Sequence, residues 1–182
     1  MRRITVANKC YFGLSKQLCS RVLSRKTKLT IYKTLILPVL LYGAETWVLS
    51  DRDKQALGVF ERKILRKVFG PVKIHDEYRI RYNHELYELY ADIDVLQRIN
   101  VQRLRWLGHV VRMKDGAPAK EVFKWDVKEN RRRGRPNLRW KDQVVKNLEQ
   151  LGVENWRARA EDRSAWRGVV KKAQSTSGLY SR

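Results

Sequence analysis

Residues 94–113 read DVLQRINVQRLRWLGHVVRM and carry the clearest periodicity of the chain. Polar residues recur there at intervals of four and three, the spacing of one helical face; they are Arg98, Gln102, Arg105, His109 and Arg112. The opposite side is apolar and consists of Leu96, Ile99, Trp106, Leu107, Val110 and Val111. The stretch therefore predicts a long amphipathic helix with one face for a core and one narrow basic stripe.

The same helical spacing extends toward the N-terminus. It predicts a first helix with one apolar stripe, made of Ile4, Ala7, Tyr11, Leu14, Leu18 and Val22. A second helix begins at the cap Ser24 and is expected to kink or end just before Pro38, because proline disfavours helical backbone in the preceding residue. A third helix begins near Ser50 and ends at Gly70-Pro71. The N-terminal third of the chain is thus predicted to be helical.

The rest of the chain is also predicted to be mainly helical, with one irregular connection. Residues 71–84 show no clean period and predict an irregular connection with a short extended piece. Further helices are expected at about 85–91, 119–127, 138–151 and 154–173, with a turn at Asp115-Gly116 and another break at Gly152. The predicted fold class is all-α. The tryptophans Trp47, Trp106, Trp156 and Trp166 are assigned to the core by default.

The composition is that of a folded, strongly basic protein. The chain has 182 residues, of which 43% are hydrophobic, and 40 Lys plus Arg against 19 Asp plus Glu give a formal net charge of +21. Such an excess repels itself in a compact fold unless an anionic polymer neutralises it. The apolar run at 35–42 is shorter than the roughly 20 residues that span a bilayer, so we expect no membrane segment. We expect a nuclear or cytoplasmic protein whose partner is nucleic acid.

The cations that we predict to bind nucleic acid come from three places. The first is a helix face with like charges at i and i+4, at Arg62, Lys63, Arg66 and Lys67. The second is the stripe of Arg98, Arg105, His109 and Arg112, and the third is the basic segment with Arg131, Arg132, Arg133, Arg135 and Arg139. A solvated helix face is the open alternative for the first two.

The basic segment admits more than one interpretation. Its core, Arg133-Gly134-Arg135-Pro136, resembles an AT-hook, in which arginines enter a narrow A·T minor groove. General binding to the phosphate backbone and a solvated linker between helical segments are the alternatives. Trp140 follows closely and can stack on a base or join the core.

Six blocks of the sequence together resemble the region after the polymerase palm in LINE-type (non-LTR) retrotransposon reverse transcriptases. They are KLTIYKTL (28–35), PVLLYGAETW (38–47), FERKILR (60–66), RLRWLGHVVRM (103–113), GRPNLRW (134–140) and DRSAWR (162–167). The blocks occur in the order of that family and cover nearly the whole chain. The resemblance implies a C-terminal portion of such an enzyme: a helical thumb that grips the primer–template duplex, then a region that holds element RNA or target DNA.

The resemblance also implies a domain organisation. We expect a thumb-like helical bundle at 1–70, a connecting helical region at 71–127, a basic linker at 128–137, a short C-terminal helical segment at 138–174 and a tail at 175–182. The fingers and palm of the family would precede this portion.

The catalytic residues of that family are not found in the sequence. Polymerase chemistry needs carboxylates that hold two Mg²⁺ ions, which the family supplies as a Tyr-x-Asp-Asp turn. Here Tyr90-Ala91-Asp92-Ile93-Asp94 separates the two aspartates, which we interpret as a cap for the following helix. We therefore expect a chain that is not an enzyme by itself, with no metal, cofactor or small-molecule substrate. Two other functions stay open: a host-recruited helical protein-interaction module, and a small DNA-binding regulator that uses the arginine arm.

Overall fold

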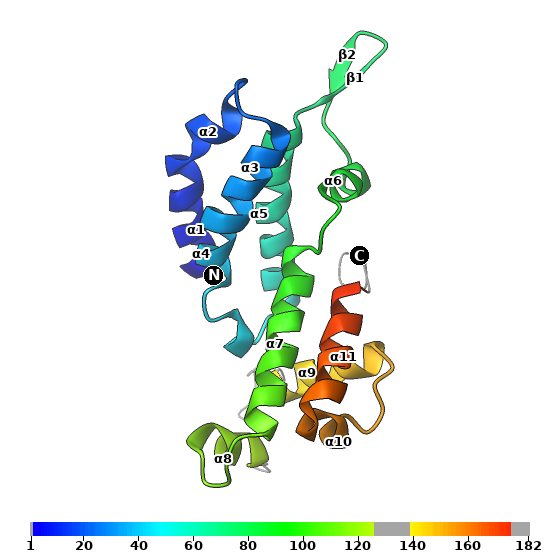
Figure 1. Cartoon of the computed structure of the whole chain (residues 1–182). Helices are drawn as coiled ribbons and strands as arrows, with labels where there is room; N and C mark the ends of the chain where they lie inside the picture. The colour runs from blue at the N-terminus through cyan, green and yellow to red at the C-terminus, as the bar shows by residue number, and fades with distance from the viewer. Residues whose placement is uncertain (1, 126–138, 176–182) are drawn as a thin grey trace. The chain divides into compact units, whose positions relative to one another are not determined.

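The computed structural model describes residues 2–125 and 139–175, and it confirms the all-α fold class. Within those ranges the one exception to helix and loop is a two-stranded hairpin (Figure 1). The described residues divide into two compact units. Unit 1 comprises residues 2–43 and 51–96, and unit 2 comprises 44–50, 97–125 and 139–175. The boundary falls between residues 96 and 97, whereas the sequence places a boundary at residue 70.

Unit 1 contains the N-terminal helices and the hairpin. Its elements are α1 (Arg2–Gly13), α2 (Ser15–Cys19), α3 (Arg25–Ile31), a π-helical turn η1 (Tyr32–Ile36), α4 (Leu37–Leu41), α5 (Asp51–Phe69), β1 (Val72–Ile74), β2 (Glu77–Arg79) and α6 (Asn83–Tyr90). Unit 2 contains η2 (Ala44–Thr46), nearly all of α7 (Val95–Val111), α8 (Pro118–Lys124), α9 (Trp140–Gln150), α10 (Trp156–Glu161) and α11 (Arg163–Ser175).

The predicted first helix is in fact two helices. It breaks after Gly13, because glycine is a poor helix former and Leu14 leaves helical geometry. Ala7, Tyr11 and Leu18 are buried as the stripe predicts. Val22 is 93% exposed, so its assignment to the stripe was wrong: α2 ends at Cys19 and Val22 lies beyond any helix.

The second helix begins as predicted but does not end at Pro38. The Ser24 hydroxyl oxygen accepts a hydrogen bond from the backbone N–H of Thr27 at 3.1 Å, which confirms the cap. The chain then stays helical through Pro38, so the predicted stop was wrong, because η1 widens the preceding turn. In that turn the N–H of Leu37 donates to the carbonyl oxygen of Tyr32, five residues back. A π-turn gives the proline ring room and absorbs its missing N–H.

The core of unit 1 contains one buried carboxyl group. Glu61 lies on the apolar face of α5 and is completely buried. Its carboxylate accepts hydrogen bonds from the Tyr32 hydroxyl at 3.0 Å, the Tyr87 hydroxyl at 3.3 Å and the backbone N–H of Val95 at 3.1 Å. Burial raises the pKa of Glu61 to about 7, with a further contribution from the charge of Asp94. Glu61 therefore joins η1, α6 and the start of α7 to α5.

The short extended piece predicted after α5 is the hairpin of β1 and β2. Val72 pairs with Arg79 and Ile74 with Glu77 in antiparallel register. The two turn residues, His75 and Asp76, both have positive φ, of 43° and 70°. Two consecutive left-handed residues are typical of the type I′ turn, whose twist matches that of the strands.

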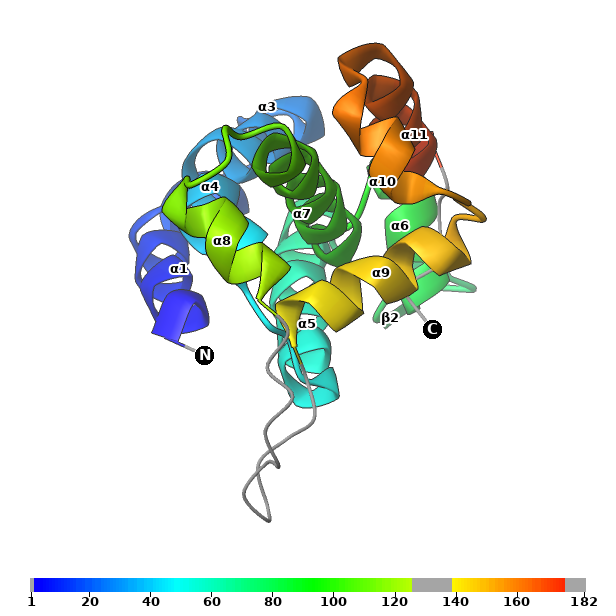
Figure 2. The same ribbon diagram turned by 90° about the horizontal axis from the view of Figure 1, so that it is seen from below.

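Unit 2 is built on α7, α9 and α11, which lie next to one another in Figures 1 and 2. Their apolar faces form one core. α9 is fixed to α7 by a hydrogen bond from the Asn147 amide to Asn100 Oδ1 at 3.0 Å. The Arg103 guanidinium, also buried, donates to the carbonyl oxygen of Trp47 and to Gln143 Oε1. Arg103 is thus a structural cation of α7, on the side away from the basic stripe.

α7 and α11 run antiparallel and are joined by side-chain contacts at one end and in the middle. At one end, Gln97 Nε2 donates to the carbonyl oxygens of Ala173 and Gln174, at 3.0 and 3.1 Å. In the middle, Trp166 Nε1 donates to the carbonyl oxygen of Leu104 at 2.9 Å. Gly108 makes this approach possible, since a Cβ there would lie 2.2 Å from Trp166 Nε1. The two helices are therefore in direct van der Waals contact at this point.

The helix predicted at 154–173 is divided at Asp162. The Asp162 carboxylate accepts from the backbone N–H of Ser164 at 2.8 Å and of Ala165 at 3.3 Å, which caps the start of α11. The break ends α10 and starts a helix that lies against α7. Of the four tryptophans assigned to the core, Trp166 is buried, while Trp47, Trp106 and Trp156 are half-buried.

Candidate nucleic-acid interface

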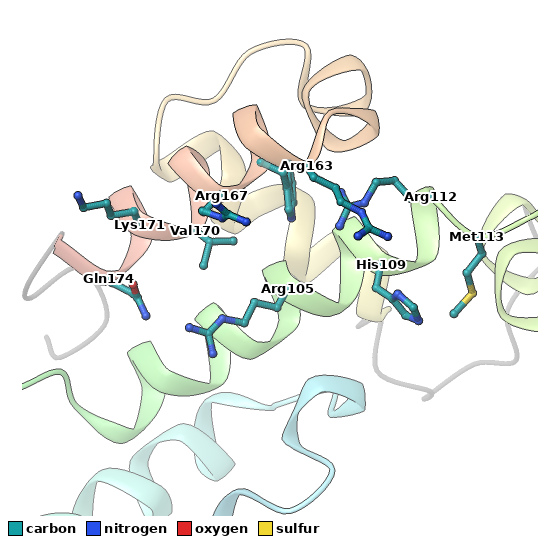
Figure 3. A pocket seen from close by; sticks show the side chains of 10 residues that line it. Arg105, His109, Arg112, Met113, Arg163, Arg167, Val170, Lys171 and Gln174 are labelled. Carbon is teal, nitrogen blue, oxygen red and sulfur yellow. The ribbon is translucent and has the colours of Figure 1, made fainter.

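A groove of about 770 Å³ lies between α7 and α11 on the surface of unit 2 (Figure 3). Both helices contribute to it, and cations predominate. The lining residues are Arg105, His109, Arg112, Met113, Arg163, Trp166, Arg167, Val170, Lys171 and Gln174. None of these is acidic. We name this surface the α7–α11 groove.

The groove has an apolar floor and charged walls. Trp166 and Val170 are buried at 3% and 9% exposure, and together they form the floor. Arg105 on α7 and Arg163 and Arg167 on α11 are exposed. Long basic side chains that rise from an apolar floor keep their charged ends in solvent, where they can contact an anion.

At one end of the groove, two arginines face each other. Figure 3 shows Arg112 beside Arg163. The pKa of the Arg112 guanidinium is lowered, by burial first and then by the positive charge of Arg163, and the carboxylate of Asp162 offsets part of this. Arg112 Nη1 donates to the carbonyl oxygen of Ala160, which fixes its position. Two like charges held this close favour a bound anion between them.

The wall contributed by α11 follows from simple helical spacing. Arg163, Arg167 and Lys171 stand at i, i+4 and i+8 and therefore lie on one side of the helix. Sequence reasoning did not select these three residues. Their spacing in the sequence could have indicated them, because it is the same four-residue spacing of cations that predicts the basic face at residues 62–67. Which helix α11 would pair with could not be read from that spacing.

The basic stripe of α7 divides between the groove and its surroundings. Arg105, His109 and Arg112 line the groove, as neighbours on one wall. Arg98 is half-buried and is not among the lining residues. The structure thus brings together three of the four predicted residues of this stripe and adds a row of cations opposite them.

The predicted cations of α5 lie in unit 1 and already have contacts there. Lys63 donates to Asn8 Oδ1 at 3.1 Å, and its ammonium lies 4.6 and 4.7 Å from the ring centroids of Tyr11 and Phe12. Arg66 donates to Asn83 Oδ1 at 2.8 Å. These contacts join α5 to α1 and α6, so both cations stabilise the packing of unit 1.

The remaining two cations of α5 are also engaged. Arg62 hydrogen-bonds the hydroxyl of Tyr87, and a hydrogen bond to Cys19 raises the pKa of Lys67. Lys63 and Lys67 are nevertheless exposed. Nucleic-acid binding by this face of α5 stays a prediction.

The arginine segment lies mostly outside the described residues. Arg131, Arg132, Arg133 and Arg135 fall in the range 126–138, and their predicted role stays a prediction. Arg139 is half-buried and directly precedes α9. Next to it, Trp140 packs against the unit 2 core, and its Nε1 donates to the carbonyl oxygen of Glu45 at 2.6 Å. This contact favours the core interpretation of Trp140 over base stacking.

The two aspartates that resemble a catalytic pair have structural contacts. Asp92 pairs with Lys33 at 2.5 Å, and its Oδ1 accepts from the backbone N–H of Ile93 at 2.7 Å. Asp94 is buried directly before α7. Across residues 2–125 and 139–175, no three His, Cys, Asp or Glu side chains are grouped so that they could hold a metal ion.

The chain is similar to a transposon-derived protein of Caenorhabditis elegans. The two are 23% identical over 172 residues, an alignment that covers 91% of this chain and 62% of that protein. The chain therefore spans less than two thirds of the length of this relative. No protein-family model matches the chain, and no solved structure matches it. The similarity supports a transposon-related origin.

In the part of the chain that the structure describes, no helix combines the length and apolar character needed to cross a bilayer.

Proposed function

We propose that the chain is a nucleic-acid-binding region of a retrotransposon reverse transcriptase, equivalent to the thumb and post-thumb part, with no polymerase activity by itself. The transposon-derived relative supports the origin. The order of the six sequence blocks supports the assignment to the LINE-type family. Neither tells which surface does the binding.

The observation that carries the proposal is the α7–α11 groove. It gathers four arginines, a lysine and a histidine from two helices, with no acidic side chain among its lining residues. Arginine and lysine in such numbers suit phosphates, which accept charge-assisted hydrogen bonds from them. The formal net charge of +21 provides long-range attraction to the same polymer.

The test is the salt dependence of binding by the full chain. Fluorescence anisotropy is measured with labelled RNA, DNA duplex and RNA–DNA hybrid at several salt concentrations. If about 6–10 phosphates are contacted, affinity falls by roughly 10³–10⁵-fold between about 50 and 200 mM salt. Unlabelled heparin and duplexes of different sequence serve as competitors.

The alternative functions give different results. A host-recruited protein-interaction module has little affinity for any of the three probes, or an affinity that stays flat across the salt range. An AT-hook-like regulator prefers A·T-rich duplex over G·C-rich duplex by a wide margin, because its arginines depend on the narrow minor groove. The proposed function expects binding to both duplexes with similar affinity.

A further inference from the structure

We propose that the α7–α11 groove seats the phosphodiester backbone of one nucleic-acid strand, and that α11 supplies the second wall of this site through Arg163, Arg167 and Lys171. This inference rests on the proposed function and assigns it to one surface. It also states what part of the nucleic acid is recognised: the backbone of a single strand, independent of base sequence.

The length of the two cation rows fits a short run of phosphates. From Arg105 to Arg112 is seven residues, about 10 Å along a helix, and from Arg163 to Lys171 is eight residues, about 12 Å. Adjacent phosphates of one strand are separated by a whole sugar–phosphate repeat, which is longer than the roughly 3.4 Å rise along a duplex axis, so rows of this length face only about two or three phosphates. Because α7 and α11 are antiparallel, the rows run side by side along one path.

The two rows of cations define a path for one strand. α7 and α11 are in contact through the Trp166 indole, which lies against Gly108 and donates to the Leu104 carbonyl oxygen, so the two rows of cations flank one path. A duplex is stiff over this length, so it can follow the path only where one of its backbones runs parallel to the two rows. A flexible single strand can enter along its whole length.

The chemistry of the walls and floor explains why bases are not read. The cations are donors that suit phosphate oxygens. The indole of Trp166 is buried and its N–H is used by the Leu104 carbonyl oxygen, so this ring has no free face for stacking. The other ring that lines the groove, the His109 imidazole, has its centroid 5.4 Å from that of Trp106. Base stacking, which other single-strand sites use, therefore contributes little here.

An anion in the groove also relieves repulsion that the free protein contains. Arg112 and Arg163 face each other across one end. The Asp162 carboxylate nearby is engaged in capping α11, so it neutralises them only in part. A phosphate between the two guanidinium groups would accept hydrogen bonds from both.

The experiment compares two double variants of the full chain with equal loss of charge. R105A/R167A removes one exposed arginine from each wall of the groove. K146A/R159A, the matched control, removes two exposed cations of α9 and α10 in the same unit, outside the groove. The probes are a labelled single-stranded oligothymidylate of about 12 nucleotides, an abasic oligonucleotide of the same length and a duplex of the same length. Circular dichroism melts check that both variants fold.

The groove variant is expected to lose affinity for the single strand by about tenfold or more, because each lost arginine is a charge-assisted contact. Its salt slope should fall by about 1.4, at roughly 0.7 for each lost phosphate contact on a single strand. The control should keep the affinity of the parent to within about threefold, because long-range charge effects are screened at moderate salt. The abasic probe should bind about as tightly as oligothymidylate.

Three results would overturn the inference and leave the proposed function standing. They are an equal loss in groove variant and control, a large preference of the parent for oligothymidylate over the abasic probe, and a loss in the groove variant that is larger on duplex than on single strand. If the parent protein binds none of the probes, the proposed function itself fails.

Discussion

Replacing Glu61 with glutamine should change how the stability of the chain depends on pH. The Glu61 carboxyl is buried against η1, α6 and the start of α7. The groups that face it are the hydroxyls of Tyr32 and Tyr87, the N–H of Val95 and the carboxylate of Asp94. Glutamine keeps the size of the side chain and the hydrogen bond from Tyr32 but cannot titrate.

The magnitude follows from the pKa of this group. Burial raises the pKa of Glu61 from its usual value of 4.5 to about 7 in the folded protein. The folded state therefore holds the proton more tightly than the unfolded state. The stability that this proton provides is complete below pH 4.5 and is lost as the pH rises to about 7. At about 1.4 kcal/mol for each unit of pH, the loss is about 3 kcal/mol.

The measurement is the free energy of unfolding in urea, followed by circular dichroism, for the parent and Glu61→Gln between about pH 5 and 7.5. The difference between the two proteins should shift by about 2 kcal/mol across that range, in favour of glutamine at the higher pH. All other groups are common to the two proteins, so their contributions cancel in the difference. Asp115 and Asp162, whose pKa values are lowered by their hydrogen bonds, titrate below this range. Parallel stability curves for the two proteins would refute the reasoning.

Three further predictions concern the groove and the basic segment. Gly108→Ala should destabilise the chain by about 1–3 kcal/mol in thermal unfolding, since the added methyl group meets the Trp166 indole; the control Gly168→Ala, whose methyl group meets nothing within 4 Å, should be neutral or stabilising. Changing all four of Arg131, Arg132, Arg133 and Arg135 to Ala should leave the melting temperature nearly unchanged and lower the salt slope by roughly 0.9 for each lost phosphate contact on B-form DNA; an unchanged slope would make the segment a linker only. The purified chain should incorporate no nucleotides on a primed template with Mg²⁺ or Mn²⁺; incorporation that disappears in Asp92→Asn would contradict this expectation.

The sequence predicted best those features that depend on one helix at a time. The end of α5 at Gly70-Pro71 and the cap at Ser24 are local properties of a few adjacent residues, and both are confirmed. The path of the chain at Pro38 could not be predicted in the same way. Proline restricts the preceding residue in general, but a π-turn in η1 accommodates it here, and η1 is packed through Tyr32 and Ile36 in the core of unit 1.

The groove, too, could be predicted from the sequence only in the part that a single helix determines. Periodicity placed Arg105, His109 and Arg112 on one face of α7, and the structure agrees. It did not show that α11 lies opposite them, because helix pairing depends on contacts between distant residues such as Gly108 and Trp166. A glycine in the middle of a strongly periodic helix indicates that another part of the chain packs closely against the helix at that point. It does not indicate which part of the chain this is.

The close contact of α7 and α11 also explains how a stable protein can hold two rows of like charge. Trp166 and Val170 provide apolar contact beneath the cations, so the helices are held together by the floor of the groove and not by its walls. The charged ends of Arg105 and Arg167 lie in solvent, where repulsion is weak and screened by salt; the repulsion that remains is between Arg163 and the half-buried Arg112. The like charges of the free groove therefore lower the folding stability only slightly. A phosphate strand that displaces this solvent would interact with the same charges at lower local dielectric, where each contact is stronger. The arrangement thus favours the bound state more than it destabilises the free one, and the salt slope of R105A/R167A measures how many phosphate contacts the two arginines make.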